Sequence, residues 1–250
     1  MAHIFLADGR SCRLRLFPRA KHQSRRRKAA PQPALSLFAP PDDEDLNDTA
    51  AERLAAKVAE LCLRNRNNSI ILDRMPALGL RDWWLVSESL FQSVWNLRCG
   101  RAADRSITSY DVFYFSEDPS WEAEDQVIRD AAALFADLPV AVRLRNQARA
   151  HFWFPEKFGA AYPPLTTAGE GILRLPCSAQ ALGMKRTGQE YIDVYAPFGL
   201  GDVWDIIARP NRALPLAHIY AEQTSGWRME WDKLHIYQWV DEENRRRRKP

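Results

Sequence analysis

The sequence lacks the residue patterns of several common metal-binding and hydrolytic classes. Its four cysteines show none of the paired spacings of a zinc site, and its five histidines are too dispersed to suggest one. It contains neither a phosphate-binding glycine loop nor the nucleophile elbow of a hydrolase. The chain is therefore not expected to be a zinc protein, a P-loop nucleotide hydrolase or an α/β-hydrolase.

Long hydrophobic runs are also missing from the 250 residues. Stretches such as "VFYF" are only a few residues long, well short of the roughly 20 residues that cross a bilayer. No membrane partner is expected. The scatter of the cysteines fits a reducing compartment, so we expect free thiols and a cytoplasmic location.

Basic side chains are scarce in the middle of the chain, because lysine and arginine are concentrated at its ends. Residues 1–49 hold nine and residues 245–249 hold five, which leaves 21 for residues 50–244, against 26 acidic side chains there. The middle is thus mildly acidic, although the net charge of the whole chain is +3. Nucleic acid is expected as a partner only through the basic ends.

Residues 1–48 show no sustained periodicity. They run from a basic block through a Pro/Ala linker into an acidic block, which predicts a disordered tail or an upstream start codon that is not used. An organelle transit peptide and a nucleic-acid-binding arm are the alternatives. A basic tail is predicted at residues 241–250, which leaves one domain at residues 49–240.

The first half of that domain has clear helical and strand patterns. Asp48 or Thr49 is the expected N-cap of an amphipathic helix. A short helix ended by Gly79 should follow, then a strand over "RDWWLVSES" in which Trp84 and Val86 point to one face and Trp83 and Leu85 to the other. The next segment, "ESLFQSVWNLRCG", has helical spacing, and Gly100 is its expected stop.

The second half mixes the two element types. The stretch "YDVFYF" predicts a strand, and Pro119 or Ser120 should begin a helix with an acidic first turn. The segment "PVAVRLRNQARAHFWF" is interpreted as a strand, and Thr187–Gly188 as the turn of a hairpin. Together these elements predict an α+β domain with a small mixed β-sheet flanked by helices.

Asp111, at the start of the "YDVFYF" strand, is the candidate metal ligand. Acids at i and i+2 of a strand share one face and can hold Mg²⁺ ions, which in turn hold nucleotide phosphates. Here Ser109 stands at i−2 and Phe113 at i+2, so no acidic pair is present. A hydrogen-bonded or exposed aspartate without a metal is the alternative.

A second polar cluster lies in "RNQARAHFWF". As part of a strand, Gln147, Arg149 and His151 would share one face. A guanidinium, an amide and an imidazole together suit the binding of phosphate or base edges. They suit a buried hydrogen-bond network equally well.

Several strings, in order and spacing, resemble an uncharacterised bacterial nucleotidyltransferase-like family of the DNA polymerase beta-like nucleotidyltransferase superfamily. They are "DWWLVSESLFQSVWN", "SYDVFYFSEDPSWEAED", "LRNQARAHFWFPEKFG", "YAPFGLGDVWDIIARPN" and "RMEWDKLHIYQW". The resemblance implies a small α+β fold, a glycine-containing turn after the first strand and an Asp-x-Asp strand. It also implies binding of a nucleoside triphosphate through Mg²⁺ and transfer of a nucleotidyl group to an acceptor that the family does not identify.

Carried over residue by residue, the resemblance makes Asp111 the catalytic residue and a metal ligand, with Glu88 as a substitute ligand if its side chain turns toward Asp111. The implied nucleotide-binding residues are Ser87, Ser89, Ser109, Asn146, Arg149 and His151. The departures from the family pattern lie at the expected catalytic positions. Ser109 stands where the first acid of the Asp-x-Asp strand is expected, Arg143 where many members have an acid, and Glu88 where the family has glycine.

These departures lead to the hypothesis that the chain keeps the nucleotidyltransferase fold but has lost much or all of the transferase activity. Three alternatives follow. The chain is an active Mg²⁺-dependent nucleotidyltransferase, or an inactive member that binds nucleotide or a protein with Arg143 supplying the charge of the metal, or a nucleic-acid-binding protein that acts through its tails.

Overall fold

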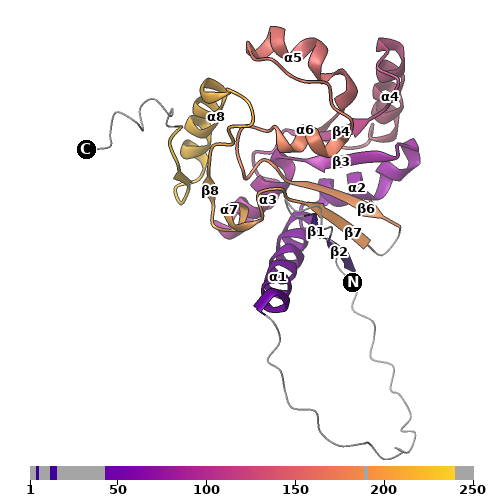
Figure 1. Ribbon diagram of the computed structural model, residues 1–250. Helices are drawn as coiled ribbons and strands as arrows, with labels where there is room; N and C mark the ends of the chain where they lie inside the picture. Colours follow the sequence, from indigo (N-terminus) through magenta and orange to yellow (C-terminus); the bar gives the residue numbers. More distant parts are fainter. Residues whose placement is uncertain (1–3, 6–11, 16–42, 189–190, 240–250) are drawn as a thin grey trace, which may run out of the picture.

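A computed structural model describes residues 4–5, 12–15, 43–188 and 191–239. Its main element is a seven-stranded mixed sheet with the strand order β1-β7-β6-β3-β4-β5, in which β2 also pairs with β7 (Figure 1). The strands are β1 (Ile4–Phe5), β2 (Cys12–Arg15), β3 (Asp82–Val86), β4 (Ser109–Phe115), β5 (Ala141–Asn146), β6 (Gly183–Thr187) and β7 (Tyr191–Tyr195). β4 and β5 are parallel, as are β1 and β7, while the other pairs are antiparallel. The predicted α+β class with a mixed sheet is confirmed.

Helices cover both faces of this sheet. The α-helices are α1 (Asp43–Leu63), α2 (Arg66–Arg74), α3 (Glu88–Arg98), α4 (Trp121–Leu134), α5 (Ala150–Phe158), α6 (Ala168–Leu173), α7 (Gly201–Trp204) and α8 (Ala217–Glu230). Two short 3₁₀ helices, η1 (Met75–Leu78) and η2 (Gln147–Arg149), and a two-stranded parallel sheet of β8 (Ile207–Ala208) and β9 (His235–Ile236) complete the described elements. None of the described helices has the length and apolarity needed to span a membrane.

The residue patterns of the strands explain which side chains face the main core and which face the cluster under α6. In β3, Trp83 and Leu85 point into the main core, while Trp84 and Val86 point into a smaller cluster under α6. Both faces of this strand are buried, as its uninterrupted apolar run requires. In β4 burial alternates strictly, so that one face of the strand is half-exposed. That half-exposed face carries the candidate site.

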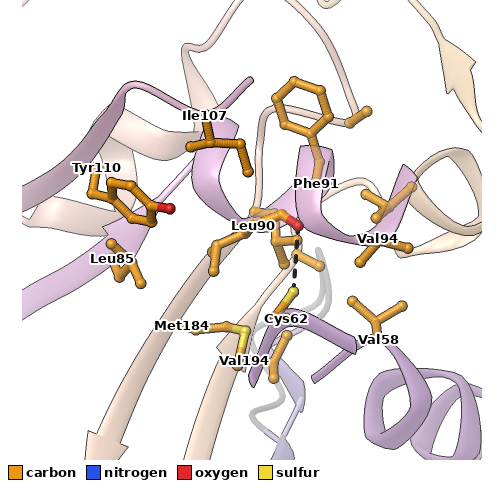
Figure 2. Close-up of a cluster of buried hydrophobic side chains, with 14 of the residues drawn as sticks. Val58, Cys62, Leu85, Leu90, Phe91, Val94, Ile107, Tyr110, Met184 and Val194 are labelled. Atoms are coloured by element: carbon orange, nitrogen blue, oxygen red, sulfur yellow. Dashed lines mark hydrogen bonds between the residues drawn. The ribbon is translucent and has the colours of Figure 1, made fainter. Parts of the chain in front are cut away.

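The main core fills the space between the sheet and the helices α1, α2 and α3. Figure 2 shows Val58 and Cys62 of α1 against Leu90 and Val94 of α3, with Met184 of the sheet below. The Cys62 Sγ lies 3.5 Å from the Leu90 carbonyl oxygen. Burial raises the pKa of this thiol far above its ordinary value, so Cys62 behaves as a small apolar residue.

A buried polar network joins α1, α2 and α3, and nothing in the sequence pattern predicted it. The Asn65 side chain, which caps α2, donates to Ser93 Oγ at 2.9 Å and to the Tyr110 hydroxyl at 3.1 Å. Asn68 Nδ2 donates to the carbonyl oxygens of Cys62 and Ser89 at 3.0 and 2.9 Å. These amides satisfy buried groups that would otherwise destabilise the helix junction.

The start of α1 was predicted wrongly. The helix begins at Asp43, so that Asp48 and Thr49, the expected N-caps, lie inside it. The acidic run of the sequence around Asp43 suits the positive end of a helix dipole, and this tendency outweighs the capping preference of a single Asp or Thr. Of the predicted N-terminal tail, residues 4–5 and 12–15 are strands and residues 43–48 are helical. The rest of it lies outside the described residues, as does the whole predicted C-terminal tail at 241–250.

Other predicted boundaries are confirmed. Gly79 ends η1 in a left-handed conformation with φ 68°, and the Ser120 hydroxyl caps α4 by accepting from the Ala123 amide. Gly188, with φ 63°, follows β6 at the predicted hairpin turn, and β6 pairs antiparallel with β7. The expected long strand over "RNQARAHFWF" is wrong, because β5 ends at Asn146 and the following residues form η2 and α5. The Asn146 side chain accepts a hydrogen bond from the Ala148 amide and thereby starts the helical turn.

Candidate functional site

The candidate site lies on the half-exposed face of β4, where three neighbouring strands meet. In the register of the sheet Asp111 stands opposite Val86 of β3 on one side and Arg143 of β5 on the other. Ser109 shares the face of Asp111, as the i and i+2 spacing predicted. β5 is the last strand of the sheet, so Arg143 reaches this face from its edge.

Arg143 connects the two candidate ligands of β4. Its Nε donates to Asp111 Oδ1 at 2.9 Å and its Nη2 donates to Asp111 Oδ2 at 2.9 Å. The same Nη2 also donates to Ser109 Oγ at 2.6 Å. This bidentate guanidinium–carboxylate pair is the strong form of the interaction, and it raises the pKa of Arg143. Both carboxylate oxygens of Asp111 are therefore occupied by a cation that belongs to the chain.

Glu88, the first residue of α3, is the second carboxylate near this pair. Burial raises the pKa of Glu88, the charge of Asp111 raises it further, and the charge of Arg143 lowers it. Glu88 and Asp111 thus lie close enough for their charges to interact. Burial and the neighbouring Asp111 thus make the ionised form of Glu88 less favourable than that of an exposed glutamate.

The turn before α3 has an unusual backbone conformation at Ser87, with φ 60° and ψ −121°. Such a positive φ favours glycine, so Ser87 stands in a strained turn directly before Glu88. Its amide donates to the Leu182 carbonyl at 2.9 Å, which ties the turn to the segment before β6. Ser89 is buried, and its hydroxyl has no hydrogen-bond partner among the described residues.

The structure does not bring Asn146 to Asp111. Asn146 pairs in register with Tyr114, three residues along β4, about 10 Å away at 3.3 Å per residue. Its side chain is buried, accepts from the Ser116 amide at 3.1 Å and donates to the Asp118 carbonyl at 3.2 Å. In this position it fixes the loop between β4 and α4.

Arg149 and His151 also point to other partners. Arg149 forms an ion pair with Glu124 of α4, at 2.7 Å between Nε and Oε2, and its guanidinium lies near the rings of Trp121 and Phe152. The ring of His151 contacts that of Phe152 at 3.9 Å between centroids. Gln147, Arg149 and His151 do not share a strand face, since they lie in η2 and α5. Of the predicted site residues, Asp111, Ser109 and Glu88 come together, with Ser87 and Ser89 on either side of Glu88 in the chain.

The site continues into a pocket of about 240 Å³, whose wall includes Asp111 and Arg145. Its other walls come from α5, α6, the start of α8 and the segment after α6, which lie in the upper part of Figure 1. Sequence reasoning missed this pocket, because its residues are separated by up to 112 positions, from Asp111 to Gln223. The aromatic string "HFWF" contributes to one wall of the pocket, but its interpretation as part of a strand did not indicate a helix whose aromatic side chains line a pocket.

The donor set of the site is poor for a metal ion. Within residues 4–5, 12–15, 43–188 and 191–239, no three His, Cys, Asp or Glu side chains form a group that could hold one. Mg²⁺ requires several oxygen ligands in near-octahedral geometry. Here Asp111 and Ser109 both accept hydrogen bonds from Arg143. The arrangement is suited instead to an anion, which Arg143 and the exposed Arg145, two residues along the same face of β5, can bind.

Comparisons with known proteins agree with this fold. A family model described as nucleotidyltransferase matches residues 73–236. No curated protein sequence matches the chain. A solved structure, described as an NMR structure that reveals a CCA-adding enzyme head domain, is similar with a TM-score of 0.59 and 23% identity. The match covers 72% of this chain and 96% of that one. At this identity the similarity shows the fold alone.

Proposed function

Because the chain belongs to the nucleotidyltransferase family, we propose that it binds a nucleoside triphosphate, and that the guanidinium of Arg143 takes the place of the catalytic metal ion. In this proposal the chain is a nucleotide-binding member of the family with little or no transferase activity. The observation that carries this proposal is the contact of one guanidinium with both Asp111 oxygens and with Ser109 Oγ.

The proposal accounts for the mismatch between the site and Mg²⁺. Nucleotidyl transfer with metal ions needs several oxygen ligands to hold the ion against the triphosphate. The residues present do not fit this group, because Arg143 neutralises Asp111 and also donates to Ser109, and no three His, Cys, Asp or Glu side chains come together among the described residues. We therefore derive no reaction step through a metal ion.

Arg143 retains donors for a phosphate. Its side chain is 48% exposed, and no hydrogen bond to its Nη1 is found among the described residues. A guanidinium carries five N–H donors, of which the contacts with Asp111 and Ser109 use those of Nε and Nη2. The Nη1 donors, together with Arg145, would bind the phosphates, while Asp111 keeps Arg143 in position.

Metal dependence is the property that tests the proposal. We expect ATP, GTP, CTP or UTP to bind the wild-type protein with the same affinity in excess EDTA as in Mg²⁺, measured by titration calorimetry. Arg143→Ala should weaken binding in EDTA at least tenfold, since hydrogen bonds to charged groups contribute about 1.5–3 kcal/mol.

Arg129→Ala is the matched control, because Arg129 is exposed and pairs with Asp125 on the surface of α4. It removes the same charge from a residue that does not line the pocket beside Asp111, and it should leave nucleotide binding unchanged. Binding that disappears in EDTA and returns with Mg²⁺ would contradict the proposal, and so would an Arg143→Ala variant that binds as the wild type does.

A second function is favoured by the electrostatic interaction between Glu88 and Asp111. If Arg143 leaves the site, these two acids face one another, and the chain would be a transferase that moves a nucleotidyl group from a triphosphate to an acceptor. Release of pyrophosphate from a triphosphate in Mg²⁺, abolished by Asp111→Ala, would support this alternative. Nucleotide binding that Asp111→Ala leaves unchanged would oppose it.

A further inference from the structure

The pocket beside Asp111 has one wall in the sheet and another in a separate apolar cluster. Asp111 and Phe113 share a face of β4 at i and i+2, and both line the pocket. Five side chains of the apolar cluster line it from the other side, namely Trp153, Phe154, Phe158, Tyr162 and Leu216. The space measures about 240 Å³. Since an apolar cavity of about 150 Å³ holds benzene, this pocket has room for one aromatic ring and a short substituent.

Arg145 supplies a positive charge at the sheet wall. It follows Arg143 at i+2 on the same face of β5 and stands opposite Phe113 in the register of the sheet. Its side chain is therefore on the face that the pocket covers, and it lines the pocket. Arg145 is exposed, and its guanidinium makes no hydrogen bond or ion pair with another described residue. All of its N–H donors remain available to a ligand.

Arg174 adds a second positive charge. Its Nη1 donates to the Glu170 carbonyl oxygen at 2.9 Å, whereas Nε and Nη2 make no hydrogen bond within the described part of the chain. Its guanidinium carbon lies 5.6 Å from the centre of the Tyr162 ring, and both residues line the pocket. The charged end of Arg174 is thus near the aromatic wall.

The charges of the wall do not balance. Among the described residues, Asp111 is the one acid that lines the pocket, and both of its carboxylate oxygens accept hydrogen bonds from Arg143. Arg145 and Arg174 have no acidic partner of this kind. A guanidinium binds a carboxylate or a phosphate through charge-assisted hydrogen bonds, and aromatic side chains favour a ring that stacks on them or meets them edge to face. One ligand meets both conditions if it joins a ring to an acidic group.

We infer that this pocket binds a small aromatic acid, whose ring packs against the aromatic side chains of α5 and Tyr162 and whose carboxylate or phosphate group is attracted by Arg145 and Arg174. The inference goes beyond the proposed function, because the ligand is not a nucleotide and Arg174 takes no part in the proposed phosphate site. The two sites have Arg145 in common.

Three probes separate the charge of the ligand from its ring. Phenylacetate has both, phenylacetamide has nearly the same shape without the charge, and acetate has the charge without the ring. We expect the wild-type protein to bind phenylacetate at least about tenfold more tightly than either of the others, measured by ligand-observed NMR titration, because the ring and the charge both contribute. Phenyl phosphate is titrated in the same way, and whichever acid binds more tightly identifies the preferred acidic group.

Substitution of the arginines tests their part. Arg145→Gln removes the charge from an exposed position of the edge strand β5, and it should reduce the preference for phenylacetate over phenylacetamide to about threefold or less. Arg174→Gln should do the same; if its lost contact with the Glu170 carbonyl prevents folding, Arg145→Gln decides the test. Arg129→Gln is the matched control, because Arg129 lies on the surface of α4 and does not line the pocket. It should keep the full preference.

The aromatic wall is tested by Trp153→Leu. This change should weaken phenylacetate and phenylacetamide by the same factor, at least about threefold, because both lose the same ring contact. Equal binding of phenylacetate and phenylacetamide by the wild type would overturn the inference, and so would acetate that binds as tightly as phenylacetate. Failure of both phenylacetate and phenyl phosphate to bind would overturn it as well.

Phenylacetate contains no nucleotide, so this inference and the proposed function can fail separately. A protein that prefers phenylacetate to phenylacetamide but binds no triphosphate in EDTA would support the pocket for an aromatic acid and contradict the proposed function. A protein that binds triphosphates through Arg143 and does not distinguish phenylacetate from phenylacetamide would support the proposed function and contradict this inference.

Discussion

At the scale of single residues, the charge state of the site depends on three side chains that act on one another. Arg143 donates hydrogen bonds to both carboxylate oxygens of Asp111, while burial and the neighbouring Asp111 raise the pKa of Glu88. Ser109 and Arg143 thus give a site that contains a cation belonging to the chain itself. The register of β4 and β5 places Arg143 directly opposite Asp111.

Glu88 makes the stability of the fold depend on pH. Because its pKa in the folded protein is higher than its ordinary value of 4.5, its contribution to stability is fully present below pH 4.5 and is lost as the pH rises through the folded-state pKa. Glu88→Gln imitates the protonated form. We expect a higher melting temperature than wild type at pH 7, by about 2–4 °C for each kcal/mol, and no difference near pH 4.

Thermal denaturation at the two pH values checks this expectation. Glu156→Gln, on the exposed side of α5, is the control and should behave as the wild type at both. A melting temperature of Glu88→Gln that differs from wild type by the same amount at pH 4 and pH 7 would show that the effect is not one of protonation.

At the scale of elements, the two strands that form the site were predictable and the helices around the pocket were not. Alternation of burial in β4 follows directly from its sequence, and so does the two-sided burial of β3. By contrast, the end of β5 depends on one cap, in which Asn146 accepts from the Ala148 amide. Capping side chains compete with strand periodicity over a few residues, and the local pattern does not decide which of them prevails.

The junction of α1, α2 and α3 provides a test at this scale. Asn68→Ala removes the donor that satisfies two buried carbonyl groups, those of Cys62 and Ser89. We expect the free energy of unfolding to fall by about 2–4 kcal/mol, because a cavity and unpaired acceptors both destabilise. Urea denaturation followed by circular dichroism measures this loss.

Arg66→Ala is the control for this change, since Arg66 lies on the exposed side of α2 in the same helix. Its effect should stay within about 0.5 kcal/mol. An Asn68→Ala variant as stable as this control would mean that the network does not support the helix junction.

At the scale of the whole molecule, the resemblance in the sequence covered the family and the fold, and the comparisons confirm both. The resemblance did not predict the pocket, because Asp111, Gln180 and Gln223 come together only in the tertiary fold. Asn146, Arg149 and His151 remain predicted binding residues, although their contacts lie toward α4 and α5. A polar cluster in the sequence does not distinguish side chains that support a loop from those that line a site.

The cysteines report on the integrity of the whole fold. Cys62 and Cys177 are buried and free, and burial raises the pKa of the Cys177 thiol to about 11. Because the thiolate is the reactive form, alkylation of the native protein by iodoacetamide at pH 8 should spare both and modify the partly exposed Cys99. Mass spectrometry of peptides checks this result, and labelling of Cys62 as fast as Cys99 would contradict the packing of the core.

The contact between Arg143 and Asp111 also determines how the site competes with free ions. A side chain tethered to the next strand has an effective concentration near its partner that is typically in the millimolar range. A dissolved cation must compete with this local concentration to displace the guanidinium, whereas removal of ions from the solution leaves the guanidinium in place. Under the proposed nucleotide binding, the affinity for nucleotide would therefore depend little on the supply of divalent cations.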